Sequence, residues 1–260
     1  MRLDEWRYMQ LALFIKRLPL PLRPREEYTS IEKLCITDSS KGNISKIYRS
    51  LFKRDELEIP KYILKWEREL DAPRGKTSVT RIIKMTHTSA TDVRTAEMNL
   101  KCLKGWYATP DKTSNYREGQ SADCWRGCAV RGTMAHLWWD CPIIKNYWKK
   151  ILPLIKVIIK KEIIEDPWVV LFQGGEESIK EYKRSLTPHL LNAAKRLIPK
   201  KWREAESPQV WEWLESVEDT YRREEWKDGA DEENADYRGK WANWFEFKKT
   251  RGYMESLRET

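Results

Sequence analysis

The chain has few of the residues and motifs that mark catalysis or membrane insertion. It holds 3 histidines and 11 glycines in 260 residues. It contains no phosphate-binding GxxxxGK[ST] or GxGxxG motif, no HExxH motif and no GxSxG motif. Its only apolar run near the start, at 11–15, is too short for a signal peptide, and no segment approaches the roughly 20 apolar residues that span a bilayer. We therefore expect a protein without membrane partners, located in the nucleus and cytoplasm.

Alternating apolar and polar residues, which predict strands, are almost absent, whereas tryptophan is abundant, with 14 copies. The recurring pattern is an amphipathic stretch of 10–16 residues that begins at a capping residue or a proline. We therefore predict an all-α fold, as an irregular helical array. The helices are expected at about 4–18, 28–36, 44–51, 61–70, 78–87, 92–106, 142–155, 188–202 and 207–227.

Two of these segments carry expectations about which residues face inward. The 92–106 helix should be capped by Thr91 or Asp92. Its expected buried residues are Val93, Ala96, Leu100 and Leu103. The 188–202 helix should turn its lysines and arginines outward, Lys195 included, and bury Leu190, Leu191, Ala194, Leu197 and Ile198. The carboxylates of 204–236 alternate around a helix and are expected to form a solvated face.

The charge is strongly positive and unevenly distributed. The net charge is +9 and the pI about 9.2. Residues 204–236 contain 13 acidic and 3 basic residues, 237–260 add +3, and 1–203 therefore carry +16. Such a balance favours an anionic partner, although any one basic run is also compatible with a solvated helical surface.

Three of the five cysteines and one of the three histidines lie within 18 residues, with the spacing Cys124-x3-Cys128-x7-His136-x4-Cys141. Three thiolates and one imidazole form a complete tetrahedral ligand set for a structural zinc. Residues five apart lie about 140° away from each other on an ideal helix, so the helix with His136 should end before Cys141. Two alternatives stay open: buried free cysteines in a tryptophan-rich core, and a catalytic Cys–His pair.

The residues between the cysteines suggest contacts to nucleic acid. Arg126-Gly127 suits a turn between Cys124 and Cys128. Trp125, beside Arg126 in this predicted turn, is the best candidate for stacking on a base. Arg126 and Arg131 are further candidates for local contacts to a nucleic acid that is bound mainly through its phosphates. Most of the 14 tryptophans are nevertheless expected in the core, because they fall on the apolar faces of the predicted helices.

The block Cys124-Trp-Arg-Gly-Cys128 … Gly132-Thr-Met-Ala-His-Leu-Trp-Trp-Asp-Cys-Pro142 resembles the C-terminal region of the second open reading frame protein of vertebrate LINE-type (non-LTR) retrotransposons. That family has the same Cys-x3-Cys-x7-His-x4-Cys motif, with Gly-Thr before the histidine and Trp-Trp after it. The similarity extends over nearly the whole chain. Further matching segments are Ile44–Leu51, Trp66–Leu70, Lys101–Pro110, Ala193–Ile198, Trp202, Trp213-Leu214 and Lys240–Trp244.

The resemblance implies a region that binds RNA or single-stranded nucleic acid during target-primed reverse transcription. It does not imply an enzyme, because neither the reverse transcriptase nor the endonuclease motifs of the family occur here. We expect a truncated copy in four parts: helices at 1–123, a CCHC-type knuckle at 124–141 between two helical halves, helices at 142–227, and an acidic link with a docking tail at 228–260.

Two alternatives to nucleic-acid binding remain open. A host-adopted protein-interaction module could use the acidic helix of 204–236. The chain could also be a retrotransposon fragment without a function of its own. Residual polymerase or nuclease activity is disfavoured by the missing acidic metal motifs.

Overall fold

The structure, a computed structural model, describes residues 59–90, 92–174, 185–228 and 235–250, with the single residues Met9, Gln10, Leu13, Gly42, Ser45, Lys46 and Tyr253. The chain divides into two units, Met1–Glu58 and Ile59–Thr260. The helices predicted at 4–18, 28–36 and 44–51 lie largely outside the described residues. The second unit contains the core and the four predicted metal ligands.

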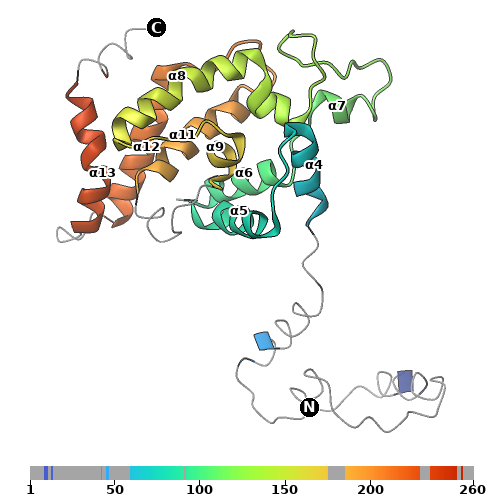
Figure 1. The fold of residues 1–260 in the computed structure, drawn as a ribbon, viewed down its shortest axis with the longest axis horizontal. Coiled ribbons are helices and arrows are strands. Elements are labelled where there is room, and N and C mark those ends of the chain that lie inside the picture. Colours follow the sequence, from blue (N-terminus) through green and yellow to red (C-terminus); the bar gives the residue numbers. More distant parts are fainter. Residues whose placement is uncertain are drawn as a thin grey trace. The chain divides into compact units, whose positions relative to one another are not determined.

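The described part of this unit is built from helices, which confirms the all-α prediction (Figure 1). In chain order they are α4 (Lys61–Leu70), α5 (Lys76–Thr88), α6 (Val93–Leu103), α7 (Pro110–Thr113), η1 (His136–Asp140), α8 (Pro142–Ile159), α9 (Pro167–Phe172), α11 (Thr187–Lys200), α12 (Val210–Asp228) and α13 (Ala235–Lys248). Among the described residues there is no strand, and an isolated β-bridge joins Asp123 and Arg131. No helix within the described ranges has the length and apolar character to cross a membrane.

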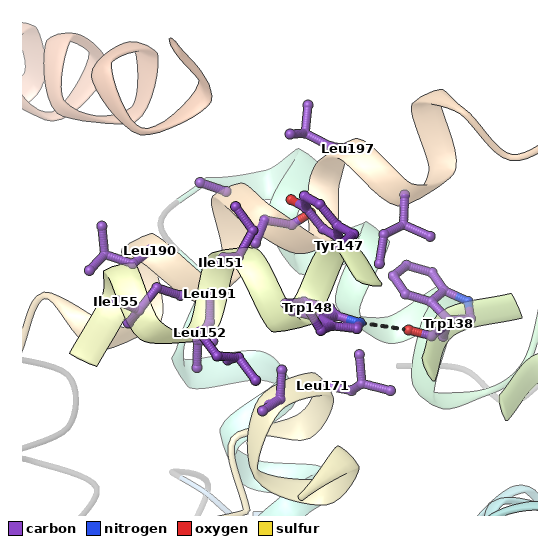
Figure 2. Close-up of a cluster of buried hydrophobic side chains, with 14 of the residues drawn as sticks. Trp138, Tyr147, Trp148, Ile151, Leu152, Ile155, Leu171, Leu190, Leu191 and Leu197 are labelled. Carbon is purple, nitrogen blue, oxygen red and sulfur yellow. Dashed lines mark hydrogen bonds between the residues drawn. The ribbon is translucent and has the colours of Figure 1, made fainter. Parts of the chain in front are cut away.

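Helix α8 lies at the centre of the core and contacts η1, α11, α12 and α13. It begins as predicted with Pro142 at its first position, where the missing N–H leaves no hydrogen bond unmade. Its inward residues recur at helical spacing and are buried: Ile144, Tyr147, Trp148, Ile151, Leu152, Ile155 and Ile158. Figure 2 shows several of them packed against leucines of α9 and α11. Burial of each such side chain stabilises the fold by about 1.5–3 kcal/mol.

The polar ends of two α8 aromatics fix the neighbouring elements. The Tyr147 hydroxyl donates to the Ala194 carbonyl at 3.1 Å, which ties α8 to α11. The Trp148 indole N–H donates to the Trp138 carbonyl at 3.0 Å, which ties α8 to η1 (Figure 2). The segment with His136 is thereby held against the core.

The expected faces of α6 and α11 need two corrections. On α11 the predicted apolar residues are buried, but Lys195, expected outward, is 2% exposed. Helical spacing explains this, because Lys195 stands four residues after Leu191 and three before Ile198. On α6, Val93 is 85% exposed, and the buried face comprises Thr95, Met98, Asn99, Cys102 and Leu103.

The polar groups on the buried faces of α6 and α11 are hydrogen-bonded to one another and to α9 and its C-cap. Lys195 Nζ donates to Asn99 Oδ1 at 2.6 Å and to the Leu171 carbonyl at 2.9 Å. Asn192 Oδ1 accepts from the amides of Asn99 and Gln173, at 3.2 and 3.1 Å. We call Asn99, Gln173, Asn192 and Lys195 the amide network. It draws a polar face of α6 into the interior, where an apolar pattern would not predict it.

Helices α12 and α13 close the C-terminal side of the unit. Val210, Trp213, Leu214 and Val217 of α12 are buried, and Tyr221 is half-buried. Trp241 and Trp244 of α13 are fully buried, so the described part of the C-terminal segment packs on the core. The expectation of a solvated acidic face is wrong in part. Glu224 accepts from the Trp241 indole at 3.0 Å and from Lys240 at 2.9 Å, and Glu218 accepts from the Trp244 indole at 3.1 Å.

Candidate metal centre

The four predicted ligands converge. We call Cys124, Cys128, His136 and Cys141 the metal tetrad. One ligand atom of each residue lies within 4.8 Å of the ligand atoms of the other three. A tetrahedral zinc with Zn–S bonds of about 2.3 Å separates its sulfur ligands by roughly 3.8 Å. Only a small contraction would therefore bring all four to zinc. Three members are buried and Cys128 is half-buried, so the set is closed.

The first two ligands come from a short hairpin, residues 122–132, which we call the knuckle hairpin. Its arms are joined by hydrogen bonds from the Cys124 N–H to the Val130 carbonyl and from the Gly132 N–H to the Ala122 carbonyl, both 2.8 Å. At its tip Gly127 has φ +77° and donates its N–H to the Cys124 carbonyl at 3.1 Å. This left-handed position favours glycine, in agreement with the turn predicted there.

The Gly-Thr pair before the histidine has a structural reason. A Cβ at Gly132 would lie 2.7 Å from Cδ of Pro110, closer than real Cβ contacts allow, so only glycine permits this approach to α7. The Thr133 hydroxyl accepts from the His136 N–H at 3.2 Å and caps the turn that follows. These contacts fix the entry of the chain into η1.

The other two ligands are brought together by a π-helical turn. In η1 the Cys141 N–H donates to the His136 carbonyl at 2.8 Å, an i→i+5 bond. This wider turn draws residue 141 back over residue 136, which an ideal α-helix would not do. Cys141 itself has φ −54° and ψ 127°, which is not helical, and it precedes Pro142. The prediction that the helix ends before Cys141 is therefore confirmed.

The electrostatic surroundings favour a thiolate at Cys141. Burial raises the pKa of this thiol, but hydrogen bonds from His136 and from the backbone N–H groups of Ile144 and Ile143 outweigh it and lower the pKa to about 6. Burial raises the pKa of Cys124 to about 12. His136 Nε2 lies 3.1 Å from Cys128 Sγ. A divalent cation would favour the deprotonated form of every thiol in the tetrad.

The three residues predicted to contact nucleic acid differ in their exposure to solvent. Arg131 is exposed at its side chain (66%) and pairs with Asp111 at 2.5 Å. Trp125 is half-buried, with the Arg203 guanidinium 5.1 Å from its ring centre. Arg126 is only 5% exposed and donates to the Leu137 carbonyl at 3.3 Å. Arg126 therefore points into the protein, and this burial argues against a phosphate contact. Arg203 was not predicted at this site.

No protein-family model matches the chain. The resemblance to the retrotransposon family therefore remains a prediction from the residues. The structure independently shows that the four side chains of the motif meet at one point, which is the arrangement that a metal site requires.

Proposed function

We propose that this chain is a helical region that binds RNA or single-stranded nucleic acid, organised by a structural zinc at the metal tetrad. In the LINE-type reverse transcriptase polyprotein that the sequence resembles, such a region would hold element RNA during target-primed reverse transcription. The observation that carries the proposal is the convergence of the four motif side chains within 4.8 Å. It supports the metal directly and the family resemblance indirectly.

The donor set fits a structural rather than a catalytic zinc. Three thiolates and an imidazole would fill all four tetrahedral positions and leave none for a water molecule. The zinc would cross-link the knuckle hairpin to η1 and to the start of α8. Structural zinc contributes an apparent 10–16 kcal/mol in finger peptides, of the order of a whole domain's stability. We therefore assign the centre no catalytic role.

Arg126 has a role beside the metal. Zinc with three thiolates carries one net negative charge, which is costly to bury without a compensating cation. The Arg126 guanidinium is buried and lowers the pKa of Cys141 electrostatically. Its Nε and Nη2 have no hydrogen-bond partner in the described part of the chain. We propose that this cation balances the zinc–thiolate charge.

Contacts to nucleic acid would be supplied by exposed groups near the centre and by the positive charge of residues 1–203. Arg131 is exposed, and the Arg203–Trp125 pair joins a cation to an aromatic ring at the surface of the knuckle hairpin. Such pairs suit a phosphate beside a stacked base. A protein that neutralises several phosphates releases counterions, so its affinity falls as salt rises.

The test is the binding of a labelled single-stranded RNA by the purified full chain at increasing salt. We expect the affinity to fall at least tenfold between roughly 50 and 200 mM salt, with a linear log–log slope. No binding at low salt, or an affinity independent of salt, would contradict the proposal.

The alternative of a protein-interaction module through the acidic helix is less well supported. Glu218 and Glu224 of α12 bind residues of α13 and are largely removed from solvent. A partner captured after nuclease treatment would favour this alternative over nucleic-acid binding.

A further inference from the structure

A cavity of about 250 Å³ lies between α4 and the chain that links α6 to α7. Four lysines contributed by both walls line it: Lys61, Lys65, Lys104 and Lys112. The one carboxylate in its lining is that of Glu69. We call this the lysine cavity. α4, α6 and α7 are labelled in Figure 1.

We propose that the lysine cavity binds a backbone phosphate of single-stranded nucleic acid, with the exposed ring of Trp106 stacking on an adjacent base. This inference rests on the proposed function and names the phosphate site within it.

The cavity has a rigid floor. Trp66 is 2% exposed, and its indole N–H donates to the Leu103 carbonyl at 2.9 Å, which joins α4 to the end of α6. Met134, two residues before the ligand His136, also lines the cavity. Gly105, which also lines the cavity, has φ +63° and turns the chain from α6 toward α7. The walls are therefore fixed before any ligand arrives, which limits the entropy cost of binding.

The lysines are held together without enough negative charge to neutralise them. Glu69 pairs with Lys65 at 3.5 Å and also accepts the Ala135 N–H at 2.9 Å. Lys112 donates to the neutral carbonyls of Gly105 and Tyr107, the latter at 3.1 Å. Neutral carbonyls accept these hydrogen bonds without offsetting the positive charge of the lysine.

Lys61 and Lys104 have no carboxylate within ion-pairing distance among the described residues. Burial lowers the pKa of Lys112, and the neighbouring charge of Lys65 lowers it further. An anion in the cavity would relieve this repulsion between like charges.

The size of the cavity favours a single phosphate over a whole nucleotide. Pockets for drug-sized ligands usually measure about 300–1,000 Å³, so this one suits a smaller group. The base would then lie outside. Trp106 directly follows the lining residues Lys104 and Gly105 in the chain, is 61% exposed, and has Lys104 Nζ 4.9 Å from its ring centre. A cation and an aromatic ring beside a phosphate site are the usual elements of single-strand binding.

The lysine cavity is connected to the metal centre through the chain before η1. Ala135, whose N–H binds Glu69, directly precedes the ligand His136. A zinc that fixes His136 would therefore also fix Glu69 and, through its ion pair, Lys65. This places the structural metal next to the phosphate site that it would support.

The experiment compares two charge-reversed variants of the full chain by fluorescence anisotropy. The cavity variant is Lys61→Glu/Lys104→Glu, and the control is Lys149→Glu/Lys150→Glu on the exposed side of α8, which changes the net charge equally. The probes are labelled single-stranded RNA and DNA of equal length and corresponding sequence. Circular dichroism checks that each variant keeps its helices.

We expect the cavity variant to bind at least tenfold more weakly than the control and to lower the salt slope by about one relative to it. Trp106→Ala should weaken binding about tenfold with an unchanged salt slope, since a stacked base carries no added charge. If the cavity variant binds RNA and DNA more weakly by the same factor, the cavity recognises the phosphate that both share. If only one of the two is bound more weakly, that nucleic acid is the one the cavity recognises.

Two results would overturn the inference while the proposed function stands. One is wild-type RNA binding with the cavity and control variants indistinguishable. The other is loss of binding to a labelled polyglutamate peptide in the cavity variant with RNA binding unchanged, which would assign the cavity to an acidic protein segment. Absence of RNA binding by the wild-type chain at low salt would overturn both proposals together.

Discussion

Two clusters of buried polar groups differ in how they are completed. The buried Arg126 side chain lies beside the metal tetrad, and the buried Lys195 side chain belongs to the amide network. Neither of these two basic side chains hydrogen-bonds a carboxylate among the described residues. Lys195 finds oxygen acceptors from Asn99 and Leu171. Arg126 finds one carbonyl and leaves two nitrogen atoms without a partner in the described part of the chain. The network is nearly completed by its own side chains, whereas the unpartnered nitrogen atoms of Arg126 accompany four converging side chains that could hold a metal ion.

The largest expected effect is on the tetrad. Cys128→Ser should abolish the binding of one zinc per chain, because four converging ligands become three and a weak hydroxyl. Removal of the metal should lower the thermal midpoint strongly, since structural zinc contributes about 10–16 kcal/mol in comparable sites. The measurement is metal analysis of purified protein together with thermal unfolding with and without a chelator.

Cys102→Ala is the matched control. Cys102 is also a buried cysteine, at 2% exposure, but it lies outside the tetrad. This variant should retain its zinc. Equal zinc content in all three proteins, or none in the wild type, would remove the metal and return the cysteines to buried core residues.

Substitution in the amide network should lower the stability by a smaller amount than loss of the metal. Lys195→Ala leaves a cavity and removes the donor that satisfies Asn99 Oδ1 and the Leu171 carbonyl. We expect a loss of about 3 kcal/mol in the free energy of unfolding, measured with urea. Lys200→Ala, on the exposed side of the same helix, should change it by less than about 0.5 kcal/mol.

The same lysine makes the stability depend on pH in a defined direction. Burial lowers the pKa of Lys195 to about 8 from 10.5, so the unfolded chain binds more protons between these values. Stability attributable to Lys195 should therefore rise from about pH 8 to pH 10.5. Cys102 nearby acts in the opposite sense above pH 9, because burial raises its pKa to about 12. The free energy of unfolding is therefore measured against pH in Cys102→Ala protein, with and without Lys195→Ala. An equal dependence on pH in the two proteins would contradict the assignment of this rise to Lys195.

The two clusters also show what a sequence can predict. The tetrad is recognisable because thiols and imidazoles are rare and their spacing is specific, and because Pro142 marks where a helix begins. The apolar faces of α8, α11 and α12 follow from their periodicity in the same way.

The amide network and the lysine cavity leave no such signal. Their side chains are common polar residues, and each cluster is formed by elements distant in the chain, such as Asn99 with Lys195 and Lys61 with Lys104. A hydrophobic pattern places charged residues outward by default, which is why the prediction for Lys195 is wrong. The burial of Arg126 is missed for the same reason. No sequence pattern distinguishes an arginine that lies buried beside a metal centre from an exposed arginine that contacts a phosphate.

The smallest expected effect concerns Arg126 and sharpens the comparison most. If its charge balances a zinc–thiolate centre, Arg126→Met should keep the zinc stoichiometry but weaken zinc affinity about 10- to 100-fold, as the loss of groups that support metal ligands does elsewhere. Competition with a chelator of known affinity measures this. Arg131→Met removes an exposed charge on the same hairpin and should leave the zinc affinity unchanged.

A second readout separates the charge of Arg126 from its packing. Arg126→Lys retains a positive charge at the cost of the planar guanidinium and should recover part of the zinc affinity. If both substitutions weaken zinc equally, Arg126 supports the centre through its shape and its hydrogen bond to Leu137. If neither does, the tetrad tolerates an uncompensated negative charge, and charge balance is not the role of Arg126.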